Sequence, residues 1–180
     1  CWRRNSAPRR SSTRTWSQTA VCVPRSDGVV EVYGSMQHPF STRRFVAALL
    51  GESLSNVEVY TIAVGGGFGG KDDTAAAVCA RAALAARLTG RPVKLRYDRE
   101  WSFRESYKRH PYRLRYKVGV SSEGRVLAVK ATIHADSGAY LSVTPWVTWR
   151  STAQCFGPYV VDAIHADVYG VATNNVFTGA

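Results

Sequence analysis

The chain has 180 residues and a mass of 19.8 kDa, of which 45% are hydrophobic and 11% aromatic. These values are typical of one globular domain or part of one. They exclude wholesale disorder, and no apolar run reaches the ~20 residues of a membrane helix. The net charge of +11 is uneven, because residues 1–25 hold six arginines and no acid. Such a basic segment is typical of a tail that binds nucleic acid or anionic lipid, of a presequence, or of a disordered end.

The ends and the cysteines suggest how the chain is organised. It begins with Cys1 and its only methionine is Met36, which indicates a fragment or a processed product. We therefore expect residues 1–18 to be a disordered or non-native basic N-terminus and residues 19–180 to be a partial domain. The four cysteines are widely spaced, without a CxxC pair or clustered histidines. This argues against a zinc site or a disulfide scaffold and favours the cytoplasm.

Taken in chain order, the elements begin with a β-hairpin whose turn chemistry comes from Asp27-Gly28. Ser41 and Thr42 are the candidate caps of the first helix, and the second is rich in alanine. From Tyr112 onward strict alternation predicts a half-exposed strand. Strand runs with two interspersed helices indicate an α+β fold in which β-hairpins and a mixed sheet pack with two main helices. The expected strands are 19–23, 29–33, 57–64, 92–97, 112–120, 126–135 and 163–171, and the expected helices are 41–50 and 72–89.

The most informative segment reads VGGGFGGKD and lies between an expected strand and an expected helix. Five of the six residues from Gly65 to Gly70, here called the glycine loop, are glycine. They permit backbone conformations and close approaches that a Cβ forbids. Successive main-chain N–H groups at a helix N-terminus suit an anion or an electron-rich oxygen. We therefore predict that main-chain atoms of the glycine loop hold a ligand.

Three other interpretations of the glycine loop fit less well. A phosphate-binding loop needs Ser or Thr after its lysine, and Lys71 is followed by Asp72. A dinucleotide fingerprint matches the glycine spacing, but Asp98 follows at a poor distance and the flanking pattern indicates antiparallel hairpins, not βαβ units. A tight strand-to-helix turn without a ligand does not call for five glycines and an interposed Phe68, because glycine loses much backbone entropy on folding.

The glycine loop and the acid after it resemble the molybdenum hydroxylase family, that is, the molybdopterin-binding subunit of xanthine dehydrogenases and aldehyde oxidases. The resemblance covers about residues 19–180 and implies that they are part of the molybdopterin-binding domain of a larger subunit. Further blocks that resemble the family, in the family's order, are Gly34–Gln37, Thr89–Val93, Asp98–Glu100, Arg109–Tyr112, Tyr116–Gly119 and Gly157–Tyr159.

The resemblance implies a molybdenum-dependent oxidoreductase that hydroxylates an electron-poor carbon with oxygen from water. It implies a molybdenum–molybdopterin cofactor in a dinucleotide form, with iron–sulfur clusters and, where present, FAD on other domains or subunits. The expected partners are the remainder of the large subunit, these electron carriers and a small-molecule substrate, with neither membrane nor nucleic acid. The catalytic base is implied to lie beyond Ala180. No catalytic residue is therefore expected in this chain, which should be inactive alone.

The resemblance also implies which residues bind the cofactor. Gln37 is implied to hydrogen-bond an oxygen ligand of the molybdenum, a contact for which an amide is suited because it donates without bringing a charge. The stretch Gly66, Gly67, Phe68 and Gly69 is implied to pass beside the cofactor. The plainer alternatives are an amide that caps the first helix for Gln37 and an ordinary core position for Phe68.

Asp72 and Arg150 are implied to bind substrate. The acid would hydrogen-bond ring nitrogens, and the arginine would stabilise negative charge on the ring. This pair favours a purine-like N-heterocycle, although aspartate is one methylene shorter than the family's glutamate and Trp146 and Trp149 depart from the family pattern. The two alternatives for these tryptophans are that they stack on a flat substrate and that they pack in the core. The plainer roles are a helix-end charge for Asp72 and a surface position for Arg150. The alternative functions are an aldehyde-oxidising member of the family and, in another class, an anion- or nucleic-acid-binding module.

Overall fold

The computed structural model describes residues 18–179, and they form two compact units, 18–107 and 108–179. The expectation for residues 1–18 therefore falls outside the described residues except at Gln18, which is buried. Within 18–179 no helix combines the length and the apolar character needed to cross a membrane. Each unit is described by itself below.

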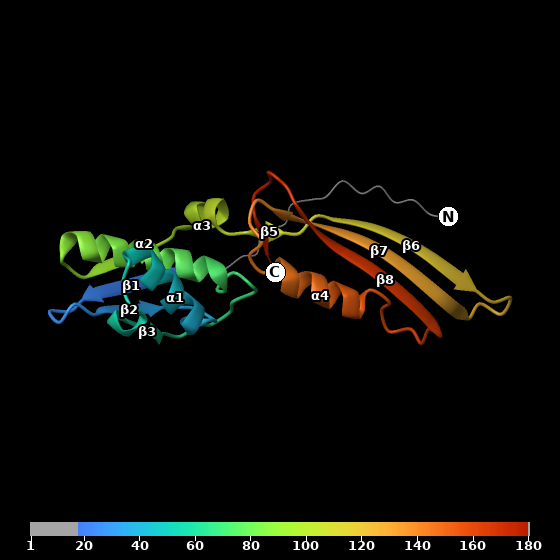
Figure 1. Ribbon diagram of the computed structural model, residues 1–180, viewed down its shortest axis with the longest axis horizontal. Helices are drawn as coiled ribbons and strands as arrows, with labels where there is room; N and C mark the ends of the chain where they lie inside the picture. The colour runs from blue at the N-terminus through green and yellow to red at the C-terminus, as the bar shows by residue number, and fades with distance from the viewer. Residues whose placement is uncertain (1–17, 180) are drawn as a thin grey trace. The chain divides into compact units, whose positions relative to one another are not determined.

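A four-stranded mixed sheet forms one layer of the unit 18–107 (Figure 1). Its strands are β1 (Thr19–Pro24), β2 (Val30–Gly34), β3 (Val57–Thr61) and β4 (Val93–Arg96), in the order β3-β2-β1-β4. β1 and β2 form the predicted antiparallel hairpin, whose turn is closed by the Val29 N–H donating to Asp27 Oδ1 at 3.2 Å. Gly28 supplies the positive φ of 88° that this turn requires.

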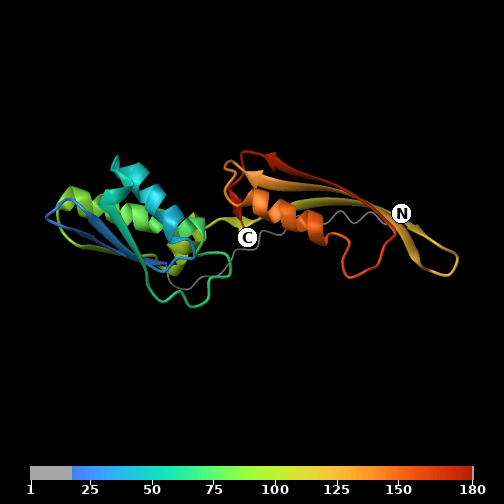
Figure 2. The ribbon, with the colours of Figure 1, turned by 60° about the horizontal axis from the view of Figure 1, so that its bottom comes forward.

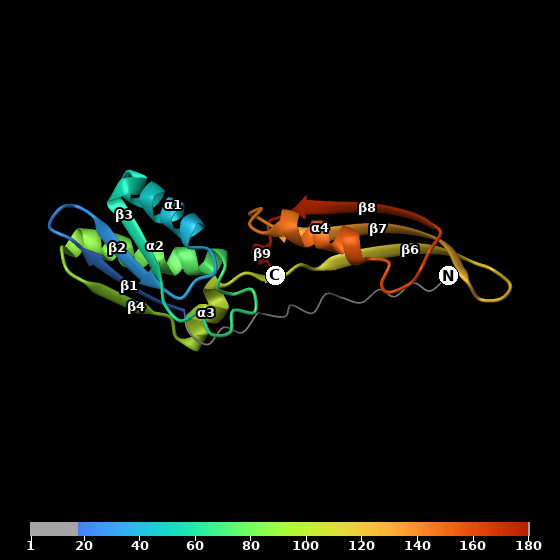
Figure 3. The same ribbon diagram turned by 90° about the horizontal axis from the view of Figure 1, so that it is seen from below.

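Two helices cover this sheet, as the sequence predicts. The helices are α1 (Pro39–Leu50) and α2 (Asp73–Thr89), and the short elements of the unit are η1 (Leu54–Asn56) and α3 (Arg99–Glu105). Nine residues of α2 are buried, mostly alanines, which allows the helix to lie close to α1 and β1 (Figure 3). Gly51 and Gly90 end α1 and α2 in the left-handed conformation.

Three expectations for this unit were wrong in detail. α1 begins at Pro39, before Ser41, because proline suits the first helical turn, and His38 at the N-cap makes no side-chain capping bond. The pairing of β2 with β3 is parallel, since α1 is a crossover between them, so this region is a βαβ unit and not a hairpin. β3 ends at Thr61, short of the expected Val64.

The unit 108–179 is built on a three-stranded sheet. Its main strands are β6 (Tyr112–Val120), β7 (Val126–Gly138) and β8 (Ala163–Ala172), in that order, with α4 (Thr144–Gln154) between β7 and β8. β6 and β7 are antiparallel, whereas β7 and β8 are parallel across the α4 crossover. α4 lies against the sheet (Figure 2), and the hydroxyls of Tyr112 and Ser151 join it to β6 at 2.9 Å. The two-residue strands β5 (Lys108–Arg109) and β9 (Thr178–Gly179) pair nearby.

The predicted alternation of β6 is present, but its apolar face is not buried. Leu114 is 55% exposed and Val118 53% exposed. The reason is that α4 is short and that its contacts with the main strands are chiefly with β8. No clear local signal predicts α4, because its tryptophans lie on the outward side, its sheet-facing side is polar, and its threonines are weak helix formers.

Candidate functional site

The start of the connection between β3 and α2 is fixed by hydrogen bonds to the end of β2, to Ser35 after it and to Lys71. The Ile62 N–H donates to Gly34 O at 3.0 Å. The Ser35 hydroxyl donates to the carbonyls of Ala63 and Val64, at 3.2 and 3.3 Å. Lys71 Nζ also donates to Val64 O, and the lysine is only 3% exposed. The main chain entering the glycine loop is therefore held on both sides.

The end of the loop is held by two buried polar side chains. Gly70 O accepts hydrogen bonds from Thr74 Oγ1 at 2.6 Å and from Gln18 Nε2 at 3.0 Å. The main-chain N–H of Gln37 donates to Lys71 O at 2.8 Å, so the segment before α1 runs beside the segment before α2. Both ends of the glycine loop are therefore anchored in the packed unit.

The middle of the glycine loop is exposed and bent by residues with positive φ. These are Gly65 at 61°, Phe68 at 47° and Gly69 at 80°. The Phe68 ring folds back over Gly66, where an added Cβ would lie 2.6 Å from Phe68 Cε2. Within residues 18–179 no main-chain N–H from Gly65 to Gly69 donates a hydrogen bond. The loop thus presents unused donors, and it is far longer than a tight turn.

Phe68 and Gln37 do not follow their plainer alternatives. Phe68 is 75% exposed, so it is not a core residue. Gln37 is exposed and caps nothing, since α1 begins without a side-chain cap. Gln37 Oε1 instead lies 2.9 Å from the position that a Cβ on Gly67 would occupy. The structure therefore brings the Gln37 amide against the main chain of the glycine loop, and a side chain at position 67 would push the end of that amide aside.

Asp72 stands at the N-cap of α2 but makes no capping hydrogen bond with its side chain. Its Oδ1 lies 3.3 Å from His38 Nε2, which extends the site along the segment that carries Gln37. Burial raises the pKa of the Asp72 carboxyl, the charge of His38 opposes this rise, and Asp73 adds to it. The carboxylate therefore lies beside the loop, partly buried, with the His38 imidazole as its partner.

Arg150 lies on α4, in the other unit, and is exposed. Trp146 and Trp149 beside it are 71% and 64% exposed, so they are not packed in the core. Their spacing places them with Arg150 on the outward side of α4. The joint action of Asp72 and Arg150 on one substrate remains a prediction.

Sequence reasoning missed the residues that support the loop. Gln18 is a buried polar side chain that bonds to the main chain of the loop, and Ser35 and Lys71 are buried polar side chains that bond to the main chain directly before it. In the sequence, Lys71 stands out only as a partial match to a phosphate loop. Its position could have predicted its burial. A lysine between a glycine-rich loop and an alanine-rich helix has its aliphatic chain next to the core.

Comparisons with known proteins identify the family of this chain. The chain matches the family described as molybdopterin cofactor-binding domain over residues 14–180. The nicotinate dehydrogenase large molybdopterin subunit of Eubacterium barkeri is 40% identical over 155 residues, which are 86% of this chain and 36% of that protein. A probable xanthine dehydrogenase subunit of Bacillus subtilis (strain 168) is 34% identical over 172 residues, or 96% of this chain and 23% of that protein.

Among solved structures, the aldehyde oxidoreductase from Desulfovibrio gigas superposes with a TM-score of 0.79 at 25% identity. The match covers 90% of this chain and 18% of that one. The chain thus belongs to the molybdopterin cofactor-binding domain family of the molybdenum hydroxylases, and it spans about a third or less of the proteins it matches.

The residues present fit such a cofactor. The glycine loop offers unused N–H donors on an exposed surface that a Cβ at Gly66 or Gly67 would fill. The Gln37 amide stands at the same surface as a neutral donor and acceptor. These groups suit a ligand with electron-rich oxygens that approaches the main chain closely.

Proposed function

We propose that this chain is the part of a molybdenum hydroxylase subunit that holds the molybdopterin cofactor and one side of the substrate site. The proposed enzyme oxidises an electron-poor carbon of a purine-like N-heterocycle with oxygen from water. The observation that carries this proposal is the carboxylate of Asp72, which caps no helix and lies beside the glycine loop and Gln37.

In this proposal Gln37 and the main chain of Gly66–Gly69 hold the cofactor. The Gln37 side chain donates a hydrogen bond to an oxygen of the bound group. Phe68 covers the loop on the solvent side. When bound, the molybdenum–molybdopterin group supplies the two-electron oxidation and the oxygen transfer. Iron–sulfur clusters, and FAD where present, belong to other domains or subunits, and a dinucleotide form of the pterin is part of the same proposal.

Asp72 and Arg150 are the proposed substrate residues. A carboxylate accepts hydrogen bonds from ring N–H groups, and an arginine stabilises negative charge that spreads onto a heterocycle. The names of two relatives, nicotinate dehydrogenase and probable xanthine dehydrogenase, indicate N-heterocyclic substrates for those proteins. Aldehyde oxidation is the second candidate, favoured by the structural likeness to an aldehyde oxidoreductase.

The cofactor assignment is tested by the molybdenum content of the complete subunit purified from cells supplied with molybdate. We expect the wild type to carry molybdenum. We expect Gly67→Val to lose most of it, because the added side chain displaces the Gln37 amide. Gly119→Val, a glycine-to-valine change on β6 with only ordinary contacts at its Cβ, serves as the control. A wild-type subunit without molybdenum would end the proposal.

The substrate assignment is tested by turnover of hypoxanthine and of benzaldehyde. Asp72→Asn and Arg150→Gln should each lower kcat/KM for hypoxanthine by about 10- to 100-fold, which corresponds to the loss of one charged hydrogen bond. Turnover of benzaldehyde should change little. Asp73→Asn removes the neighbouring acid and is the matched control. Equal losses on both substrates would contradict the substrate role of these two side chains.

A further inference from the structure

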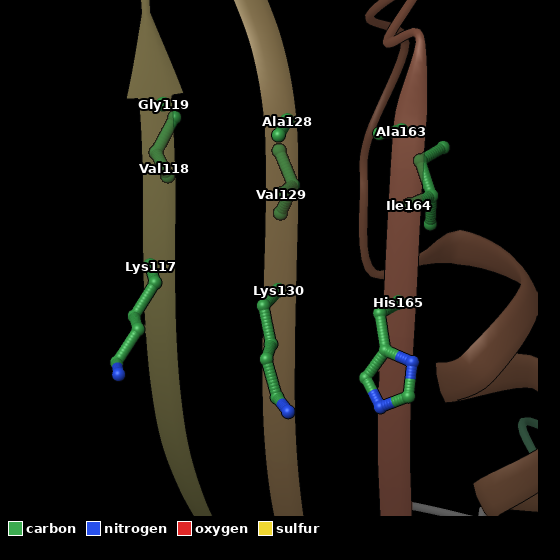
Figure 4. Close-up of a pocket in the computed structure, with 9 residues that line it drawn as sticks. All are labelled: Lys117, Val118, Gly119, Ala128, Val129, Lys130, Ala163, Ile164 and His165. Carbon is green, nitrogen blue, oxygen red and sulfur yellow. The ribbon is translucent and has the colours of Figure 1, made fainter.

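A row of basic side chains crosses the polar face of the sheet β6-β7-β8. Lys117 on β6 is the cross-strand partner of Lys130 on β7, and Lys130 is the partner of His165 on β8. We call these three residues the cationic row. All three are exposed, and Figure 4 shows them side by side on their strands, at an open depression in the sheet surface.

The cationic row is not balanced within the described chain. Like charges directly opposite each other on neighbouring strands destabilise a sheet. Among residues 18–179 the row makes ion pairs with a single carboxylate, that of Asp167, which lies 3.9 Å from Lys130 Nζ and 3.1 Å from His165 Nε2. Lys117 makes no ion pair there. Such an arrangement is expected where an anionic partner offsets the repulsion.

The same face stays basic along the strands. Arg115 lies two residues from Lys117 and pairs across the strands with Thr132, and Arg113 pairs with His134. Because side chains two residues apart share a face, these arginines extend the cationic row toward the β5 end of the sheet. The face therefore presents four side chains of fixed positive charge against two carboxylates, that of Asp167 and that of Asp136, and the latter is already bonded to Thr173 and Asn175.

Neither described unit has a net negative charge that would complement that face. Residues 108–179 hold eight Lys and Arg against four Asp and Glu, and residues 18–107 hold eleven against nine. A second copy of the chain, at +11, would be repelled. Charge complementarity therefore favours an acidic partner from outside these 180 residues.

The lining of the depression indicates which acidic partner fits. On the face that carries the cationic row, the residues next to the cations are the small Gly119, Ala128 and Ala163, because Val118, Val129 and Ile164 alternate to the opposite face. Besides His165, the aromatic rings of this face are His134 and Tyr169. They stack on each other with centroids 5.1 Å apart, so each already has one ring face covered. Figure 4 shows all nine lining residues. They are Lys117, Val118, Gly119, Ala128, Val129, Lys130, Ala163, Ile164 and His165. We propose that this face docks an acidic polypeptide segment in which carboxylates alternate with small apolar residues. This site is separate from the cofactor site and does not depend on the proposed function.

Binding of a synthetic peptide tests the proposal on the full chain. The probe is a peptide of roughly twelve residues in which glutamate alternates with alanine, and a glutamine-for-glutamate peptide is the uncharged comparison. Lys117→Glu should weaken binding of the acidic peptide at least about tenfold more than Lys94→Glu does. Lys94 is the matched control because it is an exposed strand lysine in the other unit, and its replacement changes the net charge equally.

A second measurement separates docking from misfolding. Lys117→Glu places an opposite charge against Lys130, so it should raise the midpoint of urea denaturation while it weakens peptide binding. Lys94→Glu, whose cross-strand partner is Val21, should raise the midpoint less.

Three results would overturn the proposal. The first is an equal loss of peptide binding in the two variants, and the second is equal binding of the glutamine peptide. The third is a single-stranded oligonucleotide that binds more tightly than the acidic peptide and responds to Lys117→Glu. That result would make the face a nucleic-acid surface. The N-terminal residues are the same in every protein tested, so differences between variants report on the cationic row.

Discussion

The two units of the chain bury their strands to very different extents. In the unit 18–107, Ala20, Cys22 and Val32 are fully buried beneath α1 and α2, and the glycine loop is anchored in this core. In the unit 108–179, β6 has no fully buried side chain, while Ala131 and Ala135 of the central strand are completely covered. The first unit therefore holds a site rigidly, whereas the second presents open faces.

This difference has a physical origin in the helices. α2 is alanine-rich, so its backbone lies close to the sheet and many side chains are covered at once. α4 turns threonine and serine toward its sheet and the large aromatic side chains outward. A site that needs fixed main-chain donors is suited to a sheet closely covered by helices, as in the unit 18–107. A docking face is suited to an open sheet, as in the unit 108–179. The predictions below test that contrast.

The largest effect is expected at Gly138, a tightly packed glycine at the end of β7. Gly138 has φ 69°, and a Cβ there would lie 2.3 Å from Val176 O. Gly138→Ala should therefore lower the free energy of unfolding of the unit 108–179 by about 2–5 kcal/mol, measured by denaturation. Gly124→Ala, with φ 84° and open space, is the control and should cost about 1 kcal/mol. Equal losses in the two variants would show that Gly138 is not tightly packed against Val176.

A matched pair of valines tests the contrast in burial directly. Val32→Ala removes a fully buried side chain from β2 and should cost about 2 kcal/mol in the free energy of unfolding. Val118→Ala removes the same atoms from β6, where the side chain is half exposed, and should cost less than about 0.5 kcal/mol. Urea denaturation of both variants measures the difference. A cost for Val118→Ala close to that for Val32→Ala would mean that the apolar face of β6 is covered in solution.

Lys71 gives the anchored loop a pH dependence. Burial lowers the pKa of its ammonium, so between the lowered pKa and 10.5 the unfolded chain binds more protons than the folded one. The contribution of this group to stability therefore rises with pH in that window. We expect the gain in free energy of unfolding between pH 7 and pH 10.5 to shrink in Lys71→Met. The control Lys94→Met, at an exposed position, should keep the gain, and an unchanged pH profile in Lys71→Met would contradict burial of the charge.

The smallest effects are expected from two ion pairs, one in each unit. Arg125 Nη2 lies 3.0 Å from Asp162 Oδ2 on the open sheet, and both side chains are exposed. Arg87 Nη2 lies 2.8 Å from Glu52 Oε1, and that carboxylate is mostly buried. Arg125→Ala should cost less than about 0.5 kcal/mol and Arg87→Ala about 1 kcal/mol, as measured by thermal denaturation. A larger cost for Arg125→Ala would indicate that the hairpin tip is more rigid than its exposure implies.

The elements that the sequence predicts well are those with a strong local signal. The β1–β2 hairpin follows from Asp27-Gly28, and α2 follows from its alanines and from Gly90. α4 escapes prediction because its exposed side carries the tryptophans and its sheet-facing side is polar. No apolar stripe therefore marks the side that packs. The parallel pairing of β2 with β3 is a long-range choice that no local pattern encodes.

In the candidate site, too, some residues can be identified from the sequence and others cannot. The family resemblance identifies Gln37, and the structure places its amide against Gly67. Gln18 and Ser35 escape notice in the sequence, because a buried side chain that bonds to a distant carbonyl has no sequence signature. The pairing of Asp72 with Arg150 joins residues of different units and stays a prediction.

The hydrogen bond from Gln37 N–H to Lys71 O uses main-chain atoms only. The backbone at position 37 is therefore fixed by groups that every residue except proline shares, whatever side chain it carries. A single substitution there can replace one functional group by another at the edge of the glycine loop without rebuilding the fold. Relatives that differ at this position have a ready route to new chemistry on an unchanged scaffold.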